Sequence, residues 1–172
     1  MKNFLIFLIF FFTALAQVTL VPEFTFFGAH PNLLLVLVVS WSVFFGQKAL
    51  PWTLFSGVLI GIFGGLNIGF QMFAFGLISA LTVWVSGNMF KSSNFLGLAV
   101  LVAVFTVFYN FFVALSLYIS GASASIFVQV LGLGLVEVVG NAVLAVLTFF
   151  LVSKFKSATA KMEYTKKVTS VS

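Results

Sequence analysis

The stretch from Ser125 to Lys154 constrains the fold of this chain more than any other. It is apolar over about 27 residues, long enough for a helix to cross the hydrocarbon core of a bilayer. One acid, Glu137, lies near its middle. Small and polar residues recur at three- and four-residue spacing, namely Gly134, Glu137, Asn141, Ala145 and Thr148. Because an ionisable side chain is costly in lipid, this stripe is predicted to face other helices.

The composition extends this conclusion to the whole chain. Of the 172 residues, 62% are hydrophobic and only 6% are charged, too few for the polar surface of a soluble domain. The sequence therefore predicts an all-α membrane protein, with a six-helix transmembrane domain over residues 1–153 and a basic cytoplasmic tail over residues 154–172. The absence of cysteine excludes disulfides and cysteine-based metal or redox chemistry.

Five further apolar stretches precede the last one, and short turns separate them. The expected spans cover residues 3–20, 32–46, 51–66, 70–89 and 95–119. Pro31 is expected to open the second span, since the first turn of a helix tolerates proline. The first stretch has two interpretations, a retained span or a cleaved signal peptide, because Lys2, an apolar core and the small residues Ala14 and Ala16 form the signal-peptide pattern.

The lysines predict the orientation of the spans. One lysine, Lys2, lies before span one, and every second turn contains a lysine, namely Lys48 and Lys91. A cluster that begins at Lys154 follows span six, and the alternate turns contain no lysine. All eight therefore fall on one side, which the positive-inside rule makes cytoplasmic. We expect six spans with both termini inside, and a tail that binds anionic membrane lipids rather than nucleic acid.

Spans five and six are expected to be antiparallel neighbours, because their connecting turn is short. Counted inward from the cytoplasmic boundary, Asn110 and Glu137 each lie 15 residues deep, and the same count sets Thr106 level with Asn141. The two polar pairs can then meet across one seam. We predict a hydrogen bond from Asn110 to Glu137. For Glu137 a structural role is favoured over a proton or cation relay, because the spans hold no second acid or base that would form a relay.

Glycines mark the third span. Gly57 and Gly61 lie four residues apart on one face, which predicts close approach of another helix. Packing within the bundle is the favoured interpretation. A partner helix docking on this face, a substrate cavity and a helix break are the alternatives.

The chain contains few side chains that could act in catalysis. Three glutamates and one histidine provide neither a nucleophile, base and orienting group nor a metal-binding cluster. The glycine runs lie inside apolar helices, without the strand and lysine that a phosphate-binding loop needs. We expect no enzymatic activity, no cofactor, no metal and no small-molecule substrate.

Several motifs, taken in order, carry a resemblance to a known family. They are Gln17 after the first span, the run Pro31-Asn32-Leu33 before the second, the pair Gly57 and Gly61, Asn141 in the last span, and the basic tail. In these the chain resembles MreD, the integral membrane subunit of the bacterial rod-shape machinery. It departs from that family at Gly65, where an acid is common, and at His30, where an arginine is frequent.

The resemblance implies a location, a role and partners. It implies a multi-pass protein of the bacterial inner membrane whose first span is retained. It also implies a non-enzymatic scaffold of the elongasome, which binds MreC and couples MreB filaments to lateral peptidoglycan synthesis in cell-shape determination.

A second class of protein shares the same hydropathy. The substrate-binding S components of energy-coupling-factor vitamin transporters also have about six spans in a chain of this length. Such proteins hold a vitamin with polar and aromatic residues of their external loops. The external turns here are short and poor in polar groups, which favours the scaffold interpretation.

Overall fold

All six predicted helices are present in the computed structural model, which describes residues 2–25, 28–89 and 95–169, with side chains for residues 3–88 and 95–158 of these ranges. The helices are α1 (Lys2–Thr19), α2 (Leu33–Phe45), α3 (Leu50–Phe63), α4 (Ile68–Met89), α5 (Phe95–Ile119) and α6 (Ala124–Thr169). Two short 3-10 helices, η1 (Val21–Glu23) and η2 (Gly46–Ala49), follow α1 and α2. The turn at Lys91 lies outside the described residues.

Five segments are long and apolar enough to cross a membrane, which supports the membrane class of the protein. They are residues 3–23, 33–63, 68–88, 95–119 and 124–158. One of these segments, residues 33–63, contains both α2 and α3, which have 13 and 14 residues. Each is shorter than the roughly 20 residues that a single straight span requires. The break between them falls at Gly46, whose φ of 59° favours glycine.

The centre of the molecule is α2. Ten of its 13 residues are buried, as expected for a helix that is apolar on every side. It packs against α1, α4, α5 and α6. The helix begins at Leu33, and the Asn32 side chain caps it by accepting a hydrogen bond from the Leu35 N–H at 2.9 Å. The expectation that Pro31 opens the helix was therefore wrong: Pro31 precedes the capping residue.

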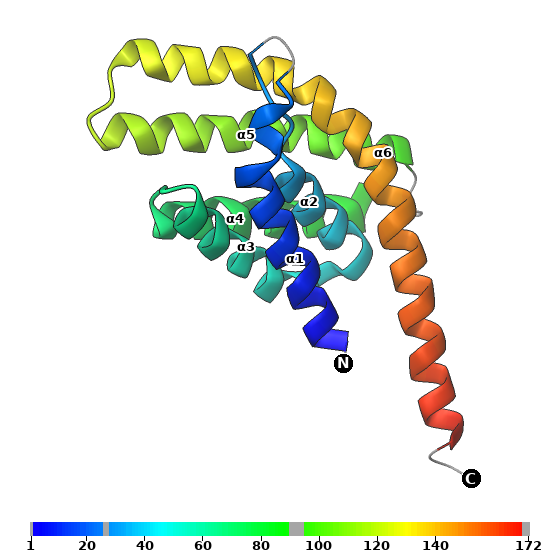
Figure 1. Cartoon of the computed structure of the whole chain (residues 1–172). Helices are drawn as coiled ribbons and strands as arrows, with labels where there is room; N and C mark the ends of the chain where they lie inside the picture. The colour runs from blue at the N-terminus through cyan, green and yellow to red at the C-terminus, as the bar shows by residue number, and fades with distance from the viewer. Residues whose placement is uncertain (1, 26–27, 90–94, 170–172) are drawn as a thin grey trace.

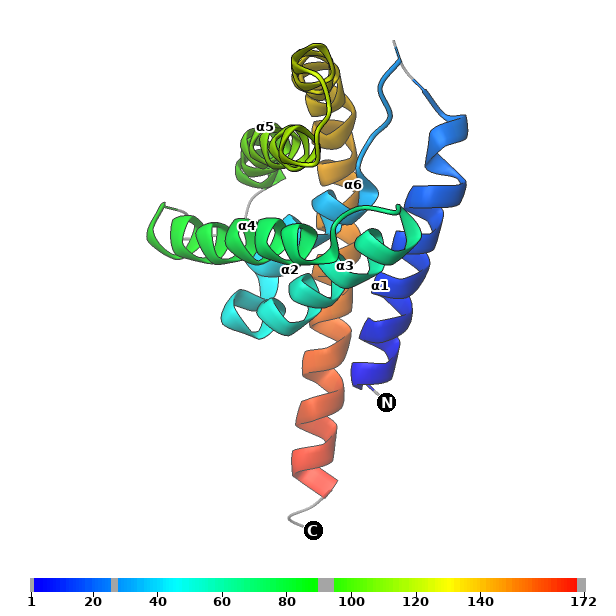
Figure 2. The ribbon, with the colours of Figure 1, turned by 90° about the vertical axis from the view of Figure 1, so that its left-hand side faces the viewer.

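The helices pair into two hairpins that run in different directions from α1. Figure 1 shows α5 lying antiparallel to the first half of α6, with α1 crossing the direction of this hairpin steeply. The other hairpin is formed by α3 and α4, which pack closely. Figures 1 and 2 agree that the α3–α4 turn and the α5–α6 turn lie at the same end of the molecule.

The last helix bends and continues beyond the predicted tail boundary. Its second half turns away from α5 and extends past the other helices (Figure 1). It was predicted to end near Lys154, but it runs unbroken to Thr169. The sequence contains neither glycine nor proline after Gly140, so no residue type that strongly breaks helices interrupts it.

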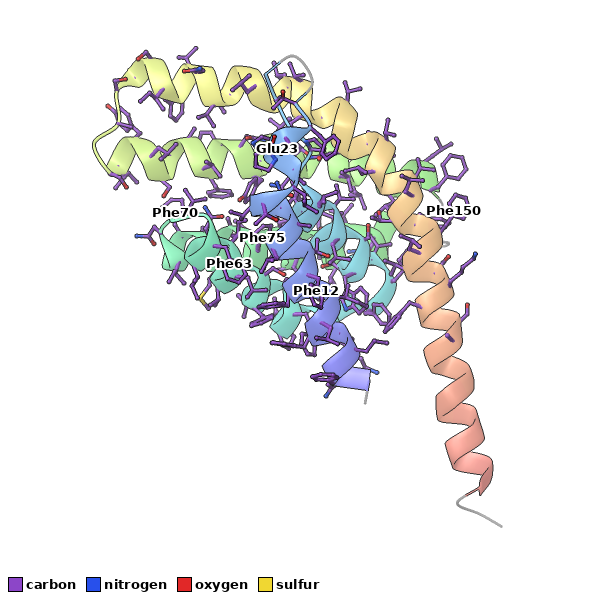
Figure 3. The ribbon with its side chains drawn as sticks, in the orientation of Figure 1. Phe12, Glu23, Phe63, Phe70, Phe75 and Phe150 are labelled. Carbon is purple, nitrogen blue, oxygen red and sulfur yellow. The ribbon has the colours of Figure 1, made fainter. Side chains whose placement is uncertain are left out.

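Aromatic side chains cover both the inside and the outside of the molecule. Phe75 is fully buried between the helices, whereas Phe12 and Phe150 are more than half exposed and point outward (Figure 3). An exposed surface this rich in large apolar side chains suits contact with lipid rather than with water.

Candidate functional site

The α5–α6 seam is built around a glycine. Gly134 faces Asn110, and a Cβ atom added at Gly134 would lie 2.8 Å from the Asn110 Cγ. The missing side chain thus makes the space in which Asn110 lies. Thr106 and Asn110 are buried on one face of α5, as the sequence pattern predicted. The stripe on α6 also faces inward, with Gly134, Asn141 and Ala145 buried.

The predicted contact between Asn110 and Glu137 is confirmed. The Asn110 Nδ2 donates to the Glu137 Oε2 at 2.8 Å. The second carboxylate oxygen, Oε1, accepts from the Asn141 Nδ2 at 3.2 Å. The same Asn141 nitrogen donates to the Thr106 Oγ1 at 2.9 Å, which confirms that Thr106 and Asn141 lie at one level. Residue counting from the turn therefore predicted the register of this seam correctly.

Asn141 also reaches the start of α2, which the sequence did not predict. Its Oδ1 accepts a hydrogen bond from the Asn32 backbone N–H at 2.6 Å. The neighbouring residue Gly140 faces the same loop, and a Cβ there would lie in contact with the Pro31 Cβ at 3.4 Å. The sequence does signal that Asn32 caps α2, because an asparagine directly before an apolar run is typical of a helix cap, but it does not signal the bond to Asn141.

Gln17 clamps the same end of α2 from the other side. Its Oε1 accepts from the Leu33 N–H at 2.6 Å, and its Nε2 donates to the Pro31 carbonyl at 3.3 Å. Together with Asn32 and Asn141, this side chain satisfies first-turn N–H groups that a helix cannot bond internally. The resulting network joins α1, α2, α5 and α6, and we call it the polar lock. Its side chains are Gln17, Asn32, Thr106, Asn110, Glu137 and Asn141.

The polar lock holds four helices together through hydrogen bonds. Both carboxylate oxygens of Glu137 accept amide hydrogens, and Glu137 is the only carboxylate among the six side chains. Within the described part of the chain, every buried side-chain nitrogen and oxygen has a hydrogen-bond partner. The same part contains no group of three acidic, histidine or cysteine side chains that could hold a metal ion.

A cavity of about 440 Å³ adjoins Glu137. His30 and Pro31 line one side of it, and Val136, Gly140 and neighbouring residues of α6 line the other. His30 is exposed, so the cavity has an imidazole on its rim and a carboxylate in its lining, while most of its wall is apolar.

Gly57 and Gly61 lie at the contact between α3 and α4. A Cβ at Gly57 would lie 2.5 Å from the Met72 Cα, and one at Gly61 would lie 2.8 Å from the Ile68 Cα. The backbones of the two helices therefore approach as closely as glycine permits. This agrees with the favoured interpretation of packing within the bundle. Because α4 covers this face, we do not place a partner helix there.

Further polar contacts link α2 and α4 to their neighbours. The Tyr109 hydroxyl donates to the Gln71 Oε1 at 3.0 Å, joining α5 to α4. Hydroxyl pairs join α2 to α4 and to α6, at 2.9 Å for Ser42 with Ser79 and 3.1 Å for Ser40 with Thr148. Sequence reasoning missed Gln71, although a lone glutamine inside an apolar helix indicates an inward position.

Comparison of the chain with models of protein families, with curated proteins and with solved structures finds no match.

Proposed function

We propose that this protein is a non-enzymatic membrane scaffold of the MreD type. In this role it would bind MreC in the bacterial inner membrane. Through MreC it would connect MreB filaments with the enzymes of lateral peptidoglycan synthesis, as part of the elongasome that determines cell shape.

One observation supports this proposal above the others. Most of the residues through which the chain resembles MreD converge on one place, although they are far apart in the sequence. Gln17, Asn32 and Asn141 bond within the polar lock, and the Pro31 carbonyl accepts from Gln17. Polar residues of apolar helices face inward in any bundle, but here the residues of the resemblance bond to one another and to one helix end. Their convergence fits a set of residues that a family needs together to hold four helices in one arrangement.

The proposal includes six spans, a retained α1 and cytoplasmic termini. The lysine distribution supports this topology, because all eight lysines fall on one side of the predicted spans. Burial of Phe10 and Ala14 against the other helices, together with the Gln17 hydrogen bonds, supports a first helix that belongs to the folded domain.

Co-purification tests the scaffold proposal. The tagged chain would be expressed with the MreC protein of the same genome, extracted in mild detergent and recovered by its tag. We expect MreC to be recovered with this protein and not with an unrelated polytopic protein that carries the same tag. A monodisperse, helical preparation that recovers no MreC would contradict the proposal.

The cavity beside Glu137 favours the second candidate, an S component. Its volume of about 440 Å³ falls in the range of about 300 to 1,000 Å³ that small-molecule sites occupy. A vitamin present at 100 times its Kd would stabilise the folded state by about 2.7 kcal/mol. A thermal-shift screen with vitamins therefore separates the two functions: a clear rise in Tm with one vitamin would favour uptake, and a flat screen would favour the scaffold.

A further inference from the structure

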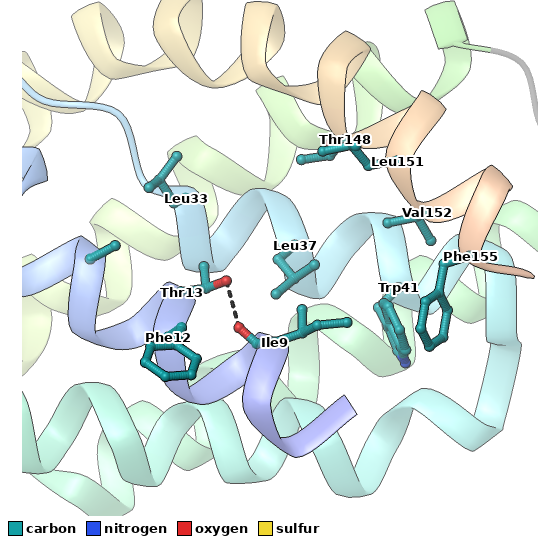
Figure 4. A pocket seen from close by; sticks show the side chains of 11 residues that line it. Ile9, Phe12, Thr13, Leu33, Leu37, Trp41, Thr148, Leu151, Val152 and Phe155 are labelled. Atoms are coloured by element: carbon teal, nitrogen blue, oxygen red, sulfur yellow. Dashed lines mark hydrogen bonds between the residues drawn. The ribbon is translucent and has the colours of Figure 1, made fainter. Parts of the chain in front are cut away.

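An open groove separates α1 from the second half of α6. Its volume is about 470 Å³, and α2 forms its floor. Figure 4 shows Ile9 and Thr13 of α1 on one side, Leu37 and Trp41 of α2 between, and residues of α6 opposite. The lining on α1 runs from Ile9 to Ala16, which at 1.5 Å per residue gives a groove about 10 Å long.

The lining is mostly apolar, and its polar groups are the Trp41 indole N–H and two threonine hydroxyls. Only two hydroxyl side chains face the groove, and both already donate to backbone carbonyls of their own helices. The Thr13 Oγ1 donates to the Ile9 carbonyl at 2.7 Å, and the Thr148 Oγ1 donates to the Leu144 carbonyl at 3.1 Å. A sugar or a charged metabolite would leave its polar groups without partners here, at a cost in free energy. A hydrocarbon chain would not.

Two lysines flank the residue that closes one end of the groove, although neither lines it. Phe155 closes this end by packing on Trp41, with ring centroids 5.3 Å apart (Figure 4). Lys154 and Lys156 come directly before and after Phe155, so they project about 100° to either side of it around the helix. The Lys156 Nζ lies 5.8 Å from the centroid of the Phe44 ring, which places its charge next to buried aromatic side chains. The basic end thus carries two cations beside an apolar slot.

We propose that this groove binds one anionic phospholipid, with an acyl chain between α1 and α6 and the headgroup phosphate at Lys154 and Lys156. An apolar slot with positive charge at a single end matches the charge and polarity of such a lipid. The site goes beyond the scaffold role, and it does not depend on the identity of any protein partner.

Trp41 lines the groove, so its fluorescence can report a bound acyl chain. A protein with Trp52→Phe and Trp84→Phe keeps Trp41 as its only tryptophan. It would be placed in phosphatidylcholine bilayers that contain a small fraction of a lipid with brominated acyl chains, because bromine quenches indole fluorescence on contact. We expect brominated phosphatidylglycerol to quench Trp41 at concentrations on the order of tenfold lower than brominated phosphatidylcholine, given two lysines near the headgroup.

A second single-tryptophan protein controls for lipid at the general surface. Trp84 is 66% exposed and does not line the groove, so a protein with Trp41→Phe and Trp52→Phe reports on bulk lipid. The two brominated lipids should quench Trp84 equally. Equal quenching of Trp41 by the two lipids would overturn the proposal, and would indicate bulk lipid or a partner helix in the groove.

Two further variants test the groove and its basic end separately. Thr13→Phe should fill the groove and abolish the selective quenching. Thr19→Phe is its matched control, because Thr19 is exposed, lies outside the groove and has the same type of bond, to the Leu15 carbonyl at 2.8 Å. The double change Lys154→Gln and Lys156→Gln should remove the preference for the anionic lipid, whereas Lys48→Gln should keep it.

Lys154 and Lys156 are exposed, and Lys156 also lies over the Phe44 ring, so thermal unfolding of the double variant should accompany the quenching measurement to check that the fold is kept. Selective quenching that survives the double lysine change would overturn the proposal, even if Thr13→Phe failed to fold.

Discussion

Asn141 uses its whole side-chain amide to connect three helices. Its oxygen accepts from the Asn32 N–H at the start of α2, and its nitrogen donates to Thr106 and to Glu137. The residue is fully buried. The consequence of a substitution here therefore depends on which buried groups it leaves unpaired.

We therefore expect Asn141→Leu to destabilise the protein strongly. It would leave the Asn32 N–H and one Glu137 oxygen without a partner, at roughly 1–3 kcal/mol for each buried group. Reversible unfolding in SDS would measure the loss. Asn88→Leu is the matched control, because Asn88 is exposed and bonds only within its own helix, to the Trp84 carbonyl at 2.8 Å. Equal stability of the two variants would contradict a bonding role for Asn141.

Glu137→Gln should be tolerated far better than Glu137→Leu. Glutamine has the same shape and keeps one acceptor oxygen, so at most one amide contact is lost. Hydrogen bonds between membrane helices contribute on the order of 0.6 to 2 kcal/mol. Leucine would leave the donors of Asn110 and Asn141 partly unpaired. A midpoint of SDS unfolding measured for both variants tests this order. Loss of cellular function in Glu137→Gln with unchanged stability would instead favour a proton relay.

The contacts of the polar lock differed in how well the sequence predicted them. The contact with Asn110 followed from residue counting, because a short turn fixes the register of two antiparallel helices. The contact of Asn141 with Asn32 joins residues 109 positions apart. It depends on how the loop before α2 folds over α6, and helical periodicity contains no information about that path.

At the scale of elements, α3 and α4 form a hairpin whose closeness depends on glycine. We expect Gly57→Leu to force these helices apart, because its Cβ would lie within 3 Å of backbone atoms of Gln71 and Met72. Overpacking against backbone costs typically about 1–3 kcal/mol and sometimes more. Gly87→Leu on α4 is the control, since no atom lies within 4 Å of a Cβ at that position. Thermal unfolding in detergent should separate the two variants clearly, and identical Tm values would show that the α3–α4 contact is loose.

Helix existence was predictable throughout, while helix length was not. The apolar runs and their turns gave all six helices, and α5 matched its expected range of 95–119. The expected spans of residues 32–46 and 51–66 instead became helices of 13 and 14 residues. The first ends before Gly46 and the second before the turn at Gly65, and both glycines have a positive φ. In contrast, α6 is longer than the predicted stretch of residues 125–154 and has 46 residues. Hydropathy marks where lipid contact ends, but a helix continues for as long as its residues allow.

At the scale of the whole molecule, the turns indicate two opposite sides. The α3–α4 and α5–α6 turns lie at one end (Figure 1), and neither contains a lysine. The helix α3 runs from η2 to the first of these turns, so η2, with Lys48, lies at the opposite end of that helix. Along α3, the connection that bears Lys48 and the lysine-free turn thus lie at opposite ends, as the positive-inside rule predicts for a helix that crosses a membrane.

Single cysteines test this topology cleanly, because the chain contains none of its own. Gln47 in η2 and Ser123 before α6 are both exposed. We expect a membrane-impermeant thiol reagent added to intact spheroplasts to label Ser123→Cys and to leave Gln47→Cys unlabelled until the membrane is permeabilised. Labelling of Gln47→Cys from outside would reverse the orientation. Labelling of both from the same side would show that α3, α4 and α5 do not all cross the bilayer, and α3, with 14 residues, is the shortest of the three.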